Sequence, residues 1–169
     1  LPGVLMHRIR IEIPSNMLVL YTIFLYCAIY LGEVRSFYYM VPHWDTVLHT
    51  FSGGVLATLG FSVITLLNKT ERIPMIMSPA FVALFTFCFA VTLGVFWEIY
   101  EYTADGILGL NMQKSALDNG QQLVGHAALG DTMKDLMVDC LGAFIVSVIG
   151  YISLKYQKGW VEKLQVLKK

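Results

Sequence analysis

The chain has 169 residues, of which 56% are hydrophobic and 14% are charged, whereas an ordinary soluble domain has about 25% charged residues. Its mean hydropathy of +0.62 indicates an integral membrane protein. Its formal net charge of zero excludes the concentrated basic face that nucleic-acid binding needs. Three cysteines lie in apolar runs without metal-ligand spacing, which predicts buried thiols rather than disulfides or a zinc knuckle.

Four apolar segments predict an all-α bundle of four transmembrane helices. A bilayer needs about 20 apolar residues, and both faces of each run are apolar, so only helices fit. The expected spans are about 16–32, 46–67, 78–102 and 131–156. We expect residues 1–15 to be a cytoplasmic connector and residues 157–169 a basic cytoplasmic tail. Because the sequence starts at Leu1 and reads there as a connector, we also expect a truncated N-terminus.

The basic residues set the expected orientation of the helices. Nine of the twelve lysines and arginines fall on one side of the four-span arrangement, and Arg35, Lys114 and Lys134 fall on the other. Since cytoplasmic loops carry the excess of positive charge, both termini are expected in the cytoplasm. The loops at about 33–45 and 102–130 are then expected outside.

Seven acids and one histidine gather at the extracytoplasmic ends of three of these helices. Helical spacing puts each set on one face of its helix. The sets are Asp45 and His49 on the second helix, Glu98, Glu101 and Asp105 on the third, and Asp131, Asp135 and Asp139 on the fourth.

Five of these residues also have a simpler interpretation. Asp131 could cap the fourth helix, Asp135 could be solvated beside Lys134, and His49 could be a packing histidine. Glu101 and Asp105 could be interfacial. Asp139 is harder to dismiss, because it lies about 12 Å below Asp131 at ~1.5 Å per residue. A lone carboxylate at that depth costs on the order of 2.5–3.5 kcal/mol.

Carboxylates that face one another repel unless something neutralises them. Apart from Lys134 and, at the margin, Arg35, no basic residue is expected at this depth. The cluster must therefore be protonated or must hold a cation. Oxygen ligands with one imidazole suit Mg²⁺, Mn²⁺, Ca²⁺ or Zn²⁺. The candidate metal ligands are the full set of eight, and His49, Glu101 and Asp135 are the candidate catalytic residues.

The stretches "WDTVLHTFSGG", "GVFWEIYEYTAD", "GLNMQ" and "DTMKDLMVDCLGAFIVSVIGY" together resemble the uncharacterised bacterial family of YjdF-like inner-membrane proteins. More loosely, the order Asp-x-x-x-His, Glu, Asp-x-x-x-Asp is similar to VanZ-like proteins, although Glu101 and Cys140 depart from that pattern. The resemblance implies a bacterial inner-membrane location and a polar core of Asp45, His49, Glu98, Asp131 and Asp135. It implies no reaction.

Three function classes follow from this pattern. The first is a metal-dependent hydrolase or transferase acting on lipid or lipid-linked phosphates, with His49 or Glu101 as proton carrier. The second is a cation or proton pathway, although the fourth helix offers only Ser147 and Ser153 below Asp139. The third is a scaffold with a structural metal. Membrane lipids are the expected partners in all three.

Overall fold

A computed structural model describes residues 11–12, 15–70, 77–117, 119–160 and 167–168. Four helical segments in this part of the chain are long and apolar enough to cross a membrane: Ser15–Val34, Trp44–Asn68, Pro79–Leu108 and Gly130–Lys155. The prediction of an all-α, four-span fold is therefore confirmed. Most of the expected N-terminal connector and much of the basic tail lie outside the described residues.

The first span changes its helical geometry partway along. It starts as the α-helix α2 (Ser15–Leu25) and continues as the π-helical segment η1 (Tyr26–Val34). The N–H of Arg35 accordingly donates to the carbonyl of Tyr30, five residues back. A short helix α3 (Phe37–Met40) then leads into α4. Two-residue strands β1 (Ile11–Glu12) and β2 (Leu167–Lys168) pair antiparallel near the ends of the chain.

Helices α4 (Trp44–Thr70), α5 (Pro79–Leu108) and α6 (Gly130–Lys155) form the core of the bundle. The helix α5 begins where Ser78 accepts a hydrogen bond from the N–H of Phe81, with Pro79 in the first turn. It ends at Gly109, whose φ of 67° is favourable only for a residue without a Cβ. The helix therefore runs past Tyr102, where the sequence predicted the loop to begin.

The helices α4 and α6 cross at very short range because glycines line the crossing. A Cβ on Gly53 would overlap the carbonyl oxygen of Asp139, and a Cβ on Gly142 would overlap the carbonyl oxygen of Thr50. Small residues thus let the two backbones touch. Below this crossing, Ala57, Ala90 and Ala143 form a small core cluster.

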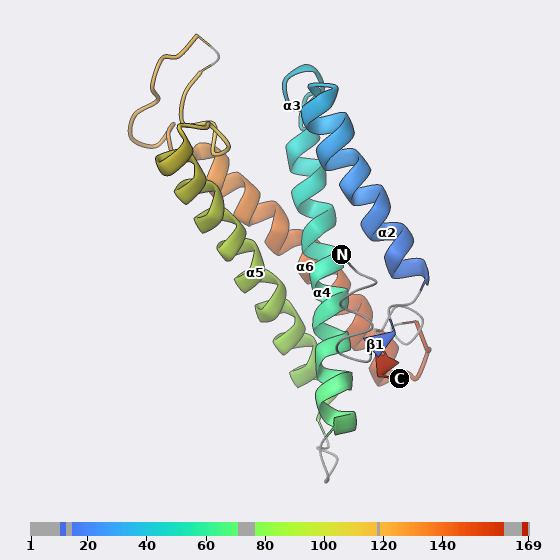
Figure 1. The fold of residues 1–169 in the computed structure, drawn as a ribbon. Helices are drawn as coiled ribbons and strands as arrows, with labels where there is room; N and C mark the ends of the chain where they lie inside the picture. Colours follow the sequence, from blue (N-terminus) through green and yellow to red (C-terminus); the bar gives the residue numbers. More distant parts are fainter. Residues whose placement is uncertain (1–10, 13–14, 71–76, 118, 161–166, 169) are drawn as a thin grey trace.

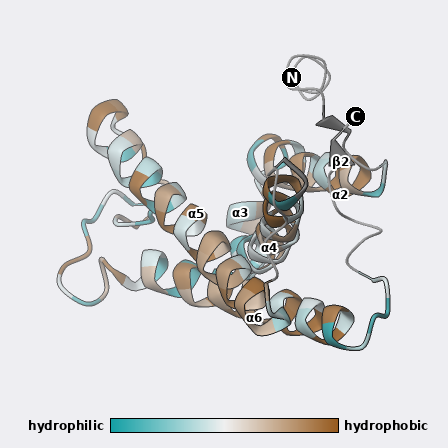
Figure 2. Cartoon of the chain, turned by 90° about the horizontal axis from the view of Figure 1, so that it is seen from below, coloured by the Kyte–Doolittle hydropathy of each residue, from teal (hydrophilic) through white to brown (hydrophobic). Residues whose placement is uncertain are grey.

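The helix α2 lies on the outside of α4 (Figure 1). Phe24 stacks on Phe51 with ring centroids 6.1 Å apart, and the indole of Trp44 donates to the carbonyl of Cys27. Large hydrophobic side chains such as Phe81, Leu84 and Phe144 are exposed on α5 and α6, and Figure 2 shows the hydrophobic colouring of these helices. Such outward faces suit lipid contact.

Candidate functional site

Three side chains that could share a metal ion lie between α4 and α6. They are at the loop end of the bundle, which we define as the end where α4 begins, α5 ends and α6 begins (Figure 1). Asp45 and His49 are one turn apart on α4, and Asp135 belongs to α6. Each offers one ligand atom, and these atoms lie within 4.8 Å of one another. His49 and Asp135 are 7% and 1% exposed.

Asp139 lies one turn further along α6 and orients the His49 ring. Its Oδ2 is 3.3 Å from Nδ1 of His49, and its Oδ1 accepts a 3.0 Å hydrogen bond from Ser52. An Nδ1–H that donates to this carboxylate leaves the lone pair on Nε2, which is 3.7 Å from Oδ1 of Asp45. Metal-bound histidines are typically held in this way by a carboxylate. Asp139 therefore orients the histidine of the three-residue group from the side of the ring opposite to Nε2.

A lysine from the loop between α5 and α6 reaches this group. The ammonium of Lys114 contacts the carboxylate of Asp45 and lies 3.6 Å from Oδ1 of Asp131. Burial would lower the pKa of Lys114, but the hydrogen bond and the charge of Asp45 outweigh burial and raise it. The expectation that only Lys134 and Arg35 could supply positive charge here was wrong, because it assumed that the loop stays away from the helices.

Asp131 is held by ion pairs instead of capping the helix. The N-cap residue of α6 is Leu129, which makes no side-chain cap. Oδ1 of Asp131 lies 4.0 Å from the ammonium of Lys134 as well as near Lys114. Asp131 therefore links the loop to the start of α6, and the interpretation as an N-cap does not hold.

The two glutamates of α5 differ in their hydrogen bonding. Glu101 is buried and accepts a 2.9 Å hydrogen bond from the indole N–H of Trp97. Glu98 is 4% exposed, and neither of its carboxylate oxygens has a hydrogen-bond partner among the described residues. Both interact electrostatically with His49, so they lie close to the three-residue group without belonging to it.

Asp105 fixes the start of the loop between α5 and α6 by hydrogen bonds. Its two oxygens accept hydrogen bonds of 2.8 and 3.0 Å from the backbone N–H groups of Met112 and Gln113. These bonds fold the chain back after α5 and bring Lys114 toward Asp45. Asp105 thus shapes the site through the backbone, and the structure does not bring it into the three-residue group.

Two polar residues of the site were absent from the sequence prediction. Ser52 could have been found, because it lies three residues after His49 and hence on the same helix face. Lys114 gave no comparable signal, since its place depends on how the loop folds.

The charge balance of the site suits a further cation. Asp45, Asp131, Asp135 and Asp139 face Lys114, Lys134 and His49 over a short distance. Oδ1 of Asp135 and Oδ2 of Asp131 are buried without a hydrogen-bond partner among the described residues. Buried carboxylate oxygens without a partner are costly, and a divalent ion would give them one.

Comparison with known proteins gives one family and one relative. The model of a family described as "Predicted membrane protein (DUF2238)" matches residues 1–156. An uncharacterised protein of Thermotoga maritima is 28% identical over 142 residues, which cover 83% of this chain and 64% of the relative. The chain therefore spans less than two thirds of that relative's length. No solved structure matches.

Proposed function

The chain belongs to the DUF2238 family of membrane proteins, and for this member we propose a metal-dependent hydrolase or transferase that acts on lipid or lipid-linked phosphates. The resemblance to an uncharacterised bacterial membrane family is thereby confirmed, whereas the looser likeness to VanZ-like proteins stays a prediction. The proposal is carried by one observation: Asp45, His49 and Asp135 can direct three ligand atoms to one point, with Asp139 fixing the histidine ring.

The residues divide into a metal group and a proton carrier. Two carboxylates and one imidazole would hold a divalent ion, which can be Mg²⁺, Mn²⁺, Ca²⁺ or Zn²⁺. Such an ion would lower the pKa of a bound water and offset developing phosphoryl charge. Glu101 is the proposed proton carrier, because it is buried nearby and held by Trp97. His49 and Asp135 act on the reaction as ligands.

Elemental analysis of protein purified without chelator tests the metal group. We expect the wild type and the control Glu33→Gln, an exposed acid near the loop end, to retain one divalent ion. Asp45→Asn and Asp135→Asn should lose it. Wild-type protein that takes up none of the four ions after dialysis would overturn the proposal.

Phosphate release tests the reaction. The purified protein is incubated with phosphatidylethanolamine, phosphatidic acid and a polyprenyl diphosphate, each with and without EDTA, and released phosphate and phosphoethanolamine are measured. Release that stops in EDTA and in Asp135→Asn supports the enzyme. A bound metal without release or transfer from any of them would instead support the scaffold with a structural metal.

A second candidate is a cation or proton pathway, and buried hydroxyl groups favour it. Beyond the acidic cluster, α4, α5 and α6 bury Thr58, Ser62, Thr86, Ser147 and Ser153. This is more than the two serines of the fourth helix that the sequence indicated. However, the fully buried ring of Phe61 packs with Ile64 and Val82 in an apolar cluster, which counts against a continuous polar path. Proteoliposomes with an internal pH dye test this candidate, and ion-dependent acidification that Asp139→Asn abolishes would favour it over the enzyme.

The proposed location is the bacterial inner membrane, with both termini in the cytoplasm and the loop end outside. The distribution of lysine and arginine supports this orientation. Labelling of intact cells by an impermeant thiol reagent checks it in a variant without the native cysteines. We expect Gln121→Cys to react and Lys158→Cys to be protected. The reverse pattern would exclude the orientation.

A further inference from the structure

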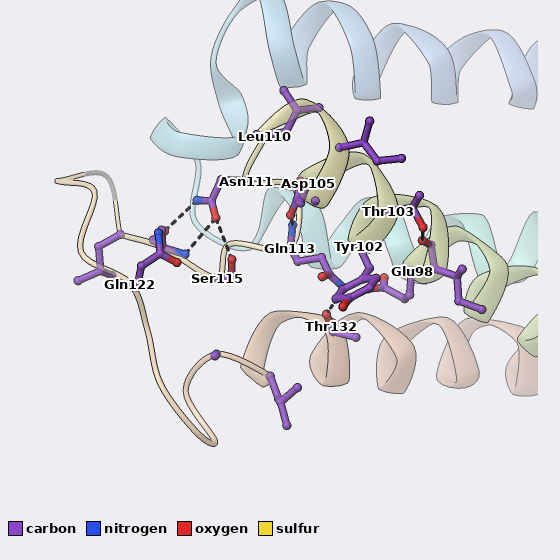
Figure 3. A pocket seen from close by; sticks show the side chains of 18 of the residues that line it. Glu98, Tyr102, Thr103, Asp105, Leu110, Asn111, Gln113, Ser115, Gln122 and Thr132 are labelled. Atoms are coloured by element: carbon purple, nitrogen blue, oxygen red, sulfur yellow. Dashed lines mark hydrogen bonds between the residues drawn. The ribbon is translucent and has the colours of Figure 1, made fainter.

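A large open pocket lies beside the metal group, between α5, the loop that follows it and the start of α6 (Figure 3). Its volume is about 1580 Å³, which is larger than most sites for small molecules. None of Asp45, His49 and Asp135 lines it. The pocket is therefore a separate space that borders the metal group through Glu98.

The walls of the pocket are amphipathic. Apolar side chains come from Val95 and Ile99 of α5 and from Leu136 of α6, and the loop adds polar side chains such as Asn111 and Gln113. An apolar wall at one side and a polar wall at the other suit a molecule with a hydrocarbon chain and a polar head.

The charge of the lining is negative. Among the residues that the structure describes, the lining side chains include two acids, Glu98 and Asp105, and no lysine, arginine or histidine. Asp105 is already satisfied by two backbone N–H groups. Glu98 is buried, with 4% of the residue exposed, and neither of its oxygens has a hydrogen-bond partner by geometry among the described residues, although its carboxylate interacts with the hydroxyl of Thr132 beside it. Glu98 is thus the group in this pocket that is left for a ligand.

We propose that this pocket binds the primary ammonium group of an aminophospholipid, with Glu98 as its counter-ion and the acyl chain along the apolar wall. An ammonium supplies both the opposite charge and the N–H donors that the two oxygens lack. An anionic head without an amine would meet two acids and no base.

This assignment names the substrate class of the proposed enzyme and in that respect rests on the proposed function. Glu98 interacts electrostatically with His49. A lipid held by its ammonium at Glu98 would therefore have its phosphate a few bonds from a residue that borders the metal group. The binding step itself needs no metal, and the two ideas can be tested separately.

Native mass spectrometry of the detergent-solubilised protein in EDTA measures the binding. The probes are phosphatidylethanolamine and phosphatidylcholine with the same acyl chains, because the choline head carries the charge without an N–H. We expect the wild type and Glu33→Gln to prefer phosphatidylethanolamine by about tenfold, as for a charge-assisted hydrogen bond. Glu98→Gln should reduce the preference to about one. Equal binding of both lipids by the wild type would overturn the inference.

A second variant keeps the test valid if Glu98→Gln does not fold. Gly106 lines the pocket, and a Cβ on it would meet nothing within 4 Å. Gly106→Phe therefore places its Cβ without a clash and adds a large side chain at the pocket wall, and it should weaken lipid binding at least tenfold. Undiminished binding in a folded Gly106→Phe would place the lipid elsewhere.

Two further comparisons distinguish a lipid ammonium from a free amine as the ligand, and failure of this inference from failure of the proposed function. Displacement of the lipid by dodecylamine but not by dodecyltrimethylammonium supports ammonium recognition, and tighter binding of dodecylamine than of the lipid would identify a free amine as the ligand. A wild type that binds metal without preferring the amine head contradicts this inference alone. A wild type that prefers the amine head but binds no metal contradicts the proposed function alone.

Discussion

Replacement of Asp139 by asparagine separates a metal-binding cluster from a set of packed, protonated acids. Asparagine keeps the size of the side chain, and its single amide oxygen can still accept from Nδ1 of His49, 3.3 Å away in the wild type. Its NH2 group would face Ser52, whose hydroxyl can accept from it and donate to the His49 carbonyl 2.8 Å away. The substitution therefore removes the negative charge behind the histidine and reverses the hydrogen bond with Ser52. Its effect on stability therefore depends on what that charge does.

The two interpretations differ in sign. If His49 binds a metal, loss of its carboxylate partner weakens affinity about 10–100-fold, which is about 1.4–2.8 kcal/mol. At saturating metal the unfolding free energy falls by the same amount, or ~3–11 °C in melting temperature on the scale of soluble domains of this size. If no metal is bound, the variant loses a buried acid and should be as stable as the wild type or more stable.

Thermal melts of both proteins, each with and without EDTA, decide between them. We expect the metal-loaded variant to melt below the wild type and the difference to vanish or reverse in EDTA. Ser52→Ala is a control that leaves the charge in place: it removes a hydrogen bond to the carboxylate, worth about 1.5–3 kcal/mol for a charged acceptor, and this loss should not depend on EDTA. A variant at least as stable as the wild type, with neither protein responding to EDTA, would refute the metal assignment.

Two more predictions concern the loop lysine and the helix crossing. Asp45 raises the pKa of Lys114 above its ordinary value of 10.5, so the contact stabilises fully below that value and loses its effect as pH rises through the raised pKa. Because the lysine side chain is 34% exposed, Lys114→Gln should cost at most about 1 kcal/mol and should lack this alkaline decline. Melts between about pH 8 and 12 check this, and parallel declines in both proteins would contradict it. Gly142→Ala should destabilise the fold by about 1–3 kcal/mol, because the added Cβ would overlap the carbonyl oxygen of Thr50. Gly130→Ala is the control and should be neutral, since its Cβ would meet nothing within 4 Å. Equal free energies of unfolding for the two variants in urea titrations would contradict the close crossing.

The helices and their acidic faces could be predicted because both depend on local spacing. Asp45 and His49 lie four residues apart, and any helix stacks them on one face. The meeting of this pair with Asp135 and Asp139 required the rotation and stagger of α4 against α6. That arrangement depends on contacts such as Gly53 against the Asp139 backbone, which link residues far apart in the sequence.

The loop shows where prediction from the sequence stops. Asp105 has the helical spacing of a site residue, yet its oxygens bind the amides of Met112 and Gln113. The same turn brings Lys114 to Asp45. The path of a loop depends on its own hydrogen bonds and not on a helical period. The sequence pattern therefore indicated neither the role of Asp105 nor that of Lys114.

The glycine crossing of α4 and α6 also limits how this protein can diversify. Gly53 touches the backbone of Asp139, and Gly142 touches that of Thr50, one residue from His49. A new side chain at either glycine would move the fold and the candidate ligands together. The glycines of the loop at 109–129 do not form such a crossing: Gly109, Gly120 and Gly125 have open space around them, and their positive φ alone favours glycine. Variants with a changed ligand preference should therefore be sought among loop residues, with the crossing left intact.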